Sequence, residues 1–315
     1  MWGQPPSVVS AAEAAVARAR SERRRALIVP REHGAWGLLL VPMVTATGVA
    51  FRASHNVASL LLLLTATLAL FWLRTTVESL LGTSVMRAQT ADERRTVLLV
   101  IAGLGAVATA SLATLLWAGQ NPYLWFIGGA AGIALVAQAL IRRMWRRSPQ
   151  PALSLSKGER SRSTHSTQNL RMLSEIVGTI ALTSTAPATC YVITGKFGAT
   201  AWMLWLANLI FAGNQIHYVQ LRIHTAKVEG PAARFAKGWA FALGQLFMAL
   251  VLAAAAWRGL MPWIALLAFV PLMFRGWIYF FQSPRPLLVR QLGWSELRQA
   301  VSFCGLFVTA FAIAR

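Results

Sequence analysis

Nine long apolar segments, separated by short connections, set the strongest constraint on how this chain of 315 residues folds. A helix needs about 20 mostly apolar residues to cross a bilayer. Hydrophobic residues make up 56% of the chain and charged residues 13%, about half the charged share of a soluble domain. The sequence therefore predicts an all-α integral membrane protein. Its nine predicted transmembrane helices are 33–52, 57–75, 96–117, 122–141, 171–194, 200–221, 235–257, 260–281 and 298–314.

The distribution of charge predicts how these helices are oriented. With the N-terminus in the cytosol, all but four of the 30 lysines and arginines fall in the tail or in inner loops. Cytoplasmic loops of membrane proteins carry such an excess of basic residues, which predicts an N-in, C-out topology. All ten acidic residues also fall on the inner side. The net charge of +20 is explained by these loops, and we expect no nucleic-acid partner.

Two regions lie outside the predicted helices. Residues 1–30 form a basic cytosolic tail, either amphipathic or disordered, and have no apolar core that would mark a cleavable signal peptide. Residues 31–315 form the membrane domain, which is interrupted at 148–169 by a Ser-, Pro- and Arg-rich loop that we expect to be disordered. Cys190 and Cys304 lie inside apolar segments, so neither a disulfide nor a zinc site is expected.

Polar residues stand at the threshold of the first helix. Arg31, Glu32 and His33 directly precede the apolar run that contains Trp36. The positive N-terminal end of the helix dipole accounts for Glu32 without a ligand. His33 followed by Gly34 fits the mouth of a cytosolic cavity better, because glycine allows a ligand or a backbone to approach closely. Both interpretations stay open.

The second helix is predicted to continue past Arg74 through TTVESLLG. Its polar residues also have two interpretations, one structural and one functional. Arg74 and Glu78 are four residues apart on one helical face. They form either an interfacial ion pair or a part of a cytosolic cavity that binds an ion. Arg275, in the eighth helix, is a further candidate for the site, and the alternative is that it extends its side chain to the membrane interface.

The end of the sixth helix is the most polar helical stretch of the chain. Asn214, His217 and Tyr218 lie on one helical face, and Arg222 is next to them. Polar and charged groups at membrane depth are costly, so such a face does not point to lipid. It either locks helices together or forms the wall of a hydrated cavity.

The opening motif resembles that of a known family. The run PREHGAWGLLLVP, residues 30–42, is similar to the signature that begins the first span of the YwiC-like family of bacterial membrane proteins. The hydrophobic layout of the chain is similar too, apart from the loop 148–169. The resemblance implies a multi-pass protein of the bacterial cytoplasmic membrane. It implies no particular activity.

The nine-helix, N-in, C-out arrangement is also similar to that of UbiA-type intramembrane prenyltransferases. Those enzymes bind Mg²⁺ through aspartate-rich motifs near the ends of the second and sixth helices. Here the corresponding stretches read RTTVESLLGTSVMR and NQIHYVQLRIH, in which Glu78 is the one acidic residue. We therefore expect no metal and no other cofactor. Arginines in place of carboxylates would bind an anion directly.

Three functions stay open after this reading, and whether the protein is an enzyme is not decided. The first is binding or processing of an anionic lipid or isoprenoid phosphate in a cytosol-facing cavity formed by helices 1, 2 and 6. The second is a non-enzymatic membrane scaffold or assembly factor. The third, a small-molecule transporter, is less favoured because the outer loops are short and no inverted repeat is evident. Membrane lipids are the expected partners in each.

Overall fold

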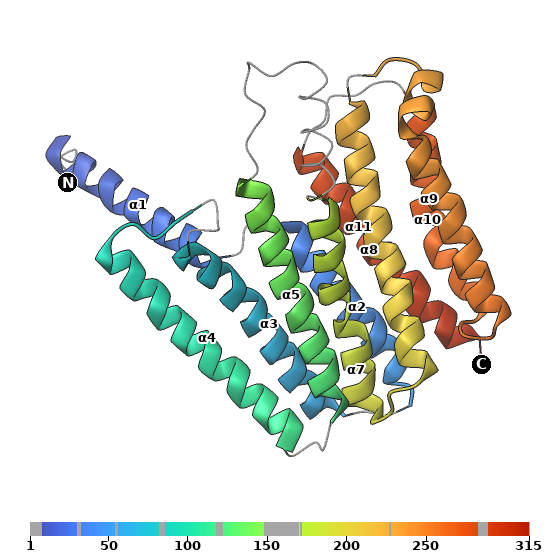
Figure 1. The fold of residues 1–315 in the computed structure, drawn as a ribbon, viewed down its shortest axis with the longest axis horizontal. Helices are drawn as coiled ribbons and strands as arrows, with labels where there is room; N and C mark the ends of the chain where they lie inside the picture. The colour runs from blue at the N-terminus through green and yellow to red at the C-terminus, as the bar shows by residue number, and fades with distance from the viewer. Residues whose placement is uncertain are drawn as a thin grey trace, which may run out of the picture. The chain divides into compact units, whose positions relative to one another are not determined.

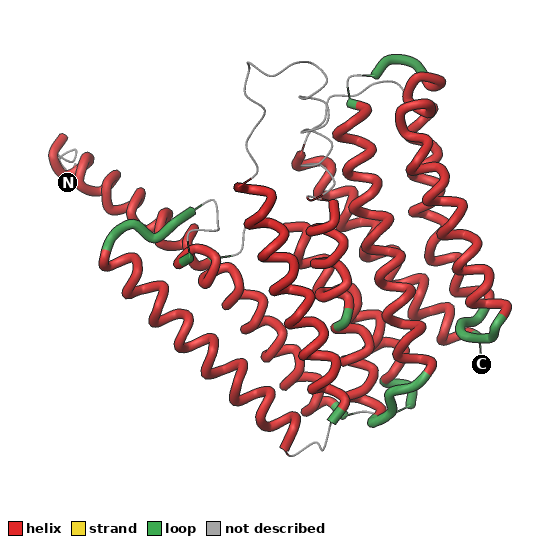
Figure 2. Tube along the Cα trace, in the orientation of Figure 1, coloured by secondary structure: helices red, strands yellow, loops and turns green. Residues whose placement is uncertain are grey.

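The structure, a computed structural model, describes residues 8–29, 33–53, 56–81, 86–117, 122–147, 170, 172–226, 228–282 and 289–314. Within these ranges the chain is helical apart from short connections and contains no strand (Figures 1 and 2). The predicted all-α class is confirmed. The loop 148–169 lies outside the described residues.

Seven helical segments of the described chain are long and apolar enough to cross a membrane. They are Val57–Leu80, Ala91–Trp117, Tyr123–Met144, Met172–Thr194, Pro231–Trp257, Trp263–Phe281 and Arg290–Ile313. Gly34–Ala50 is apolar but shorter. The 27-residue helix α8 (Ala199–Thr225) lies outside this set, and its second half contains the polar face noted above. The chain is therefore a multi-pass helical membrane protein, while nine spans and their orientation stay predictions.

Large apolar side chains point outward from these helices. Phe126 is 73% exposed, Phe247 67% and Val301 65%. In a soluble protein such a surface would promote aggregation, whereas acyl chains of lipids cover it in a bilayer. The helices are thus suited to contact with membrane lipid.

The chain divides into two compact units, and the first contains residues Met1–His33 and Leu61–Ala118. It consists of α1 (Val8–Ile28), most of α3 (Val57–Leu80) and α4 (Ala91–Trp117). The basic N-terminal tail is thus helical over α1. Leu27 of α1 packs in a buried cluster with Ala88 and Val97.

An ion pair adds to this contact between α1 and α4. Arg23 Nε donates a hydrogen bond to Glu93 Oε1 at 2.5 Å, and Glu93 Oε2 accepts one from the backbone N–H of Gln89 at 2.8 Å. The hydrogen bond and the negative charge of Glu93 raise the pKa of the Arg23 guanidinium above its ordinary value. Glu93 therefore holds both α1 and the turn that begins α4.

The second unit contains residues Gly34–Leu60 and Gly119–Arg315. Residues 172–183 are helical and lead into α7. The labelled helices of this unit are α2 (His33–Ala50), α5 (Tyr123–Arg147), α7 (Thr185–Thr194), α8 (Ala199–Thr225), α9 (Pro231–Trp257), the 3-10 helix η1 (Trp263–Phe269), α10 (Val270–Phe281) and α11 (Val289–Ile313).

Buried hydrogen bonds and stacked rings join these helices. Asn208 Nδ2 on α8 donates to Thr45 Oγ1 on α2 at 2.9 Å, and both side chains are fully buried. Phe211 on α8 stacks on Phe303 of α11 with ring centroids 4.3 Å apart. Since unpaired polar groups are costly in lipid, a paired Asn and Thr can fix how α2 and α8 face each other.

The chain order places four helix ends together. Within the second unit, α8 and α10 end, and α9 and α11 begin, at the same end of the helices (Figure 1). At the opposite end, Arg52 Nη1 donates to the carbonyl of Phe311, close to the end of α11, at 2.9 Å. The polar end of α8 therefore lies beside residues that are far away in sequence.

Candidate functional site

Arg275 on α10 is the centre of a polar cluster at this end of the second unit. Its Nη1 donates to Glu296 Oε1 on α11 at 2.7 Å, and its Nη2 donates to Gln215 Oε1 on α8 at 3.0 Å. Its guanidinium carbon lies 3.9 Å from the ring centroid of Tyr218. The side chains of Arg275 and Glu296 are only 12% and 22% exposed. The side chain of Arg275 thus joins α8, α10 and α11.

A second arginine lies between two tyrosines. The guanidinium carbon of Arg222 is 5.0 Å from the ring centroid of Tyr279, and its Nη1 lies 3.4 Å from the hydroxyl of Tyr218. The hydroxyl of Tyr279 is hydrogen-bonded to Thr225 Oγ1 at 2.8 Å. Two aromatic faces thus hold two arginines next to each other through cation–π contacts.

The third arginine of the cluster, Arg234, lies in the first turn of α9. Arg234 is 2% exposed, and its guanidinium carbon lies 5.9 Å from the ring centroid of Tyr279. Its Nε donates to the carbonyl of Val228 at 3.0 Å, and its Nη1 donates to the carbonyl of Gln282. Arg234 therefore joins the connection before α9 to the end of α10.

We call this group the arginine–tyrosine cluster. Its members are Gln215, Tyr218, Arg222, Arg234, Arg275, Tyr279 and Glu296. It contains three guanidinium groups and one carboxylate, so its formal charge is positive. Positive charge that is partly removed from water is costly unless a counter-charge is present. The cluster is therefore electrostatically suited to an anion.

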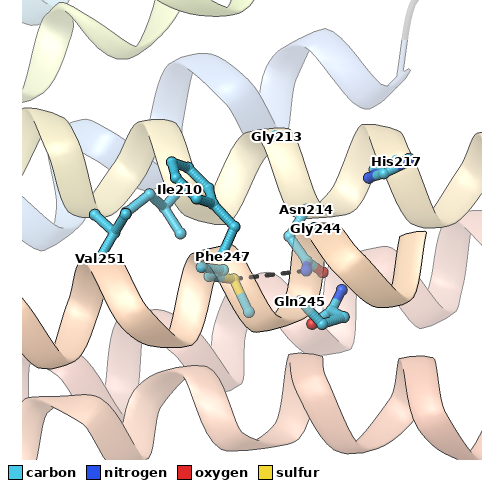
Figure 3. A pocket seen from close by; sticks show the side chains of 9 residues that line it. Ile210, Gly213, Asn214, His217, Gly244, Gln245, Phe247 and Val251 are labelled. Atoms are coloured by element: carbon cyan, nitrogen blue, oxygen red, sulfur yellow. Dashed lines mark hydrogen bonds between the residues drawn. The ribbon is translucent and has the colours of Figure 1, made fainter. Parts of the chain in front are cut away.

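A cavity of about 160 Å³ lies between α8 and α9 (Figure 3). Asn214 and His217, two of the predicted site residues, line it together with Gln245 of α9. His217 is half-buried, and its ring contacts Phe241 edge to face with centroids 5.2 Å apart. Gly244 makes room for it, since a Cβ there would lie 3.2 Å from His217 Nδ1.

The predicted residues of the second helix form a local contact in the first unit. Arg74 Nε lies 3.1 Å from Glu78 Oε1, four residues further along α3. The predicted continuation of this helix past Arg74 is confirmed, since α3 ends at Leu80. The spacing of the two residues is enough to produce this ion pair.

The predicted residues of the first helix are described only in part. Arg31 and Glu32 lie outside the described residues, and so does the side chain of His33. Trp36, on α2, is half-buried. The convergence of these residues and of Arg74 with the polar face of α8 stays a prediction.

Several members of the site were not found from the sequence. These are Gln215, Arg234, Gln245, Tyr279 and Glu296. The sequence contained a sign of two of them. Gln215 lies three residues before Tyr218 and therefore on the same side of the helix, and Glu296 is the one acidic residue after Glu229. The described residues contain no group of three or more His, Cys, Asp or Glu side chains arranged to hold a metal ion.

Comparison with known proteins concerns the first part of the chain. A family model with the description YwiC-like protein matches residues 29–153, which include the run PREHGAWGLLLVP. No curated protein and no solved structure matches the chain. The predicted resemblance to the YwiC-like family is confirmed over residues 29–153, and the chain is a multi-pass membrane protein with this family's opening segment.

Proposed function

We propose that the protein binds an anionic amphiphile, a lipid or isoprenoid phosphate, with its phosphate at the arginine–tyrosine cluster. The observation that carries the proposal is the charge of the cluster, which contains Arg222, Arg234 and Arg275 and, as its one carboxylate, Glu296. A phosphate group supplies negative charge and accepts several hydrogen bonds from a guanidinium.

Arg222 is the group best placed to take the phosphate. Arg275 is held by the carboxylate of Glu296, and Arg234 by two backbone carbonyls, so both have strong partners. Arg222 is half-buried, and its distance of 3.4 Å to the hydroxyl of Tyr218 is long for a hydrogen bond. Exchanging this weak contact for a phosphate oxygen therefore costs little.

The proposal includes a topology. We propose nine spans in a UbiA-like helical arrangement, N-in and C-out, in the bacterial cytoplasmic membrane, so that the cluster faces the cytosol. The basic residues of the connections after α8 and α10 support this orientation. A reporter that works only outside the cytoplasm should be active when fused after Arg315 and silent within 148–169. A silent fusion after Arg315 would refute the topology.

Binding can be tested with the purified full chain in detergent. The probes are farnesyl phosphate and farnesol, which differ in the phosphate group alone. Arg222→Gln should weaken binding of farnesyl phosphate about tenfold or more, because one charge-assisted contact is lost. Arg298→Gln is the matched control, since Arg298 is an exposed residue of α11 outside the cluster. Removal of divalent cations with a chelator should leave the affinity unchanged.

Two results would contradict the proposal. One is equal affinity for farnesyl phosphate and farnesol, and the other is an equal loss in Arg222→Gln and Arg298→Gln. Either result would favour the scaffold alternative, in which the cluster serves to fasten α8, α10 and α11. The same assay on Arg74→Ala tests the predicted contribution of the second helix to ligand binding.

A further inference from the structure

Exposed arginines gather in the first unit, where α3 ends and α4 begins. Arg23 of α1 donates to the carboxylate of Glu93 on α4, and its Nη2 also donates to the carbonyl of Arg87 at 3.3 Å. The residues that follow this ion pair in each helix are arginines as well, so the contact brings several arginines to one place. We call this group the basic surface. Its members, all of them exposed, are Arg24, Arg25, Arg87, Arg94 and Arg95.

The ion pair leaves the basic surface positive. Glu93 is buried, and its carboxylate is already engaged by Arg23 and by the backbone N–H of Gln89. The other acidic residues beside the surface are Glu22 and Asp92, both exposed. In the described part of the chain, no arginine of the basic surface forms an ion pair. Five guanidinium groups beside two exposed carboxylates therefore carry positive charge that an anionic partner can neutralise.

The position of the surface along α4 relates it to the membrane. This helix is long and apolar enough to span a bilayer, and its Leu98 and Leu99 are 52% and 66% exposed. Arg94 and Arg95 lie four residues before these leucines, about 6 Å along the helix axis. The headgroup region extends about 5–8 Å beyond the hydrocarbon core on each side. Arginines one turn outside lipid-facing leucines therefore lie at the depth of the headgroups.

Two contacts hold the end of α1 at the same depth. Arg23 pairs with Glu93. One turn further along both helices, Leu27 packs in a buried cluster with Val97, so α1 and α4 run side by side in the same direction. Arg24 is therefore level with the first residues of α4 and outside the apolar part. An arginine at this depth lays its aliphatic stem on apolar surface and keeps its guanidinium among the headgroups.

We infer that the basic surface binds the headgroups of anionic phospholipids, such as phosphatidylglycerol, and so docks the end of α1 on the membrane that α4 spans. Guanidinium groups form charge-assisted hydrogen bonds with lipid phosphates, and each basic residue near an anionic membrane surface adds to the attraction. A soluble polyanion fits less well, because the exposed leucines one turn away require lipid. The surface belongs to the first unit, whereas the phosphate site proposed above belongs to the second, and the inference does not depend on that site.

The test uses the purified full chain with dioleoylphosphatidylglycerol and dioleoylphosphatidylcholine as probes. The two lipids have the same acyl chains and the same phosphodiester, but phosphatidylcholine has no net charge. One basic residue near an anionic surface corresponds to about a fivefold gain in affinity, so wild-type protein should prefer phosphatidylglycerol about tenfold or more in native mass spectrometry.

Amide hydrogen exchange locates the effect. Exchange in α1 should be slower in nanodiscs that contain phosphatidylglycerol than in nanodiscs of phosphatidylcholine alone. The difference should disappear in about 1 M salt, where the Debye length falls to about 3 Å. This measurement on wild-type protein covers the case in which a variant fails to fold.

Three double variants separate charge from structure. Arg24→Gln with Arg94→Gln should reduce the preference for phosphatidylglycerol about tenfold, whereas Arg24→Lys with Arg94→Lys should keep it, because lysine retains the charge. Arg258→Gln with Arg298→Gln is the matched control. It removes two charges as well, and both residues are exposed and lie outside the first unit.

Equal affinity of wild-type protein for the two lipids would overturn the inference and favour a soluble polyanion as the partner. An equal loss of preference in the control variant would overturn it too, and so would a difference in α1 exchange that persists in high salt. Arg222→Gln should leave the lipid effect on α1 exchange unchanged, because Arg222 belongs to the second unit. Failure of this surface and failure of the phosphate site are thus separate results.

Discussion

Replacing Arg275 with methionine should destabilise the protein strongly, because one side chain joins α8, α10 and α11. The change removes the 2.7 Å contact with Glu296, the 3.0 Å hydrogen bond to Gln215 and the ring contact with Tyr218. It also leaves the carboxylate of Glu296, 22% exposed, without the cation that it contacts directly, so that Arg222 is the nearby cation that still acts on it. Breaking a buried ion pair in this way typically costs about 3–5 kcal/mol. Since both side chains keep some exposure, we expect about 3 kcal/mol.

A double-mutant cycle measures how much the interaction between Arg275 and Glu296 contributes to the free energy of unfolding, separately from their other contacts. Glu296→Leu alone leaves Arg275 without its carboxylate, whereas Arg275→Met together with Glu296→Leu removes both charges. The double variant should therefore be less destabilised than the sum of the single variants, with a coupling of about 1–3 kcal/mol. The free energy of unfolding is measured by denaturant titration in mixed micelles, with helicity followed by circular dichroism.

Arg74→Met is the matched control for this cycle. Arg74 and Glu78 are similarly exposed, at 18% and 24%, but they are neighbours within one helix. An ion pair of this kind contributes only about 0.2–0.5 kcal/mol. A loss in Arg275→Met no larger than that in Arg74→Met would refute the reasoning, since the contacts between helices would then add nothing.

Three further predictions concern other parts of the molecule. Gly238→Ala should cost about 1–3 kcal/mol in the same unfolding assay, because the new Cβ would lie 2.8 Å from Phe280 Cε1; an unchanged stability would show that the helices move apart freely. Arg23→Ala should speed amide hydrogen exchange in α1, since the contact with Glu93 is lost; unchanged exchange would mean that apolar packing alone holds α1. Deleting 150–167 should leave the unfolding temperature unchanged, as the composition of this polar loop predicts, and a large drop would show that it packs.

The helical class and the positions of the apolar helices follow from the local sequence. Each of the nine apolar segments is helical over most of its described residues, because the partition of a segment into lipid depends mainly on its own side chains. Contacts between residues of one helix could also be predicted from the sequence. The pairing of Arg74 with Glu78 follows from a spacing of four residues, and the polar face with Asn214 and His217 follows from the helical period.

The contacts between polar groups of different helices depend on how the helices pack. Arg275 and Glu296 lie on different helices 21 residues apart, and no local period links them. The sequence left Arg275 with two interpretations, a site residue or an interfacial arginine, because hydropathy reports how deep a residue lies and not which neighbour it faces. Gln245, in the middle of an apolar helix, became part of a site only when α9 packed against α8 and set its amide beside Asn214. Hydropathy is a property of one segment, whereas a binding site requires side chains from several helices to meet, and that depends on how their surfaces pack.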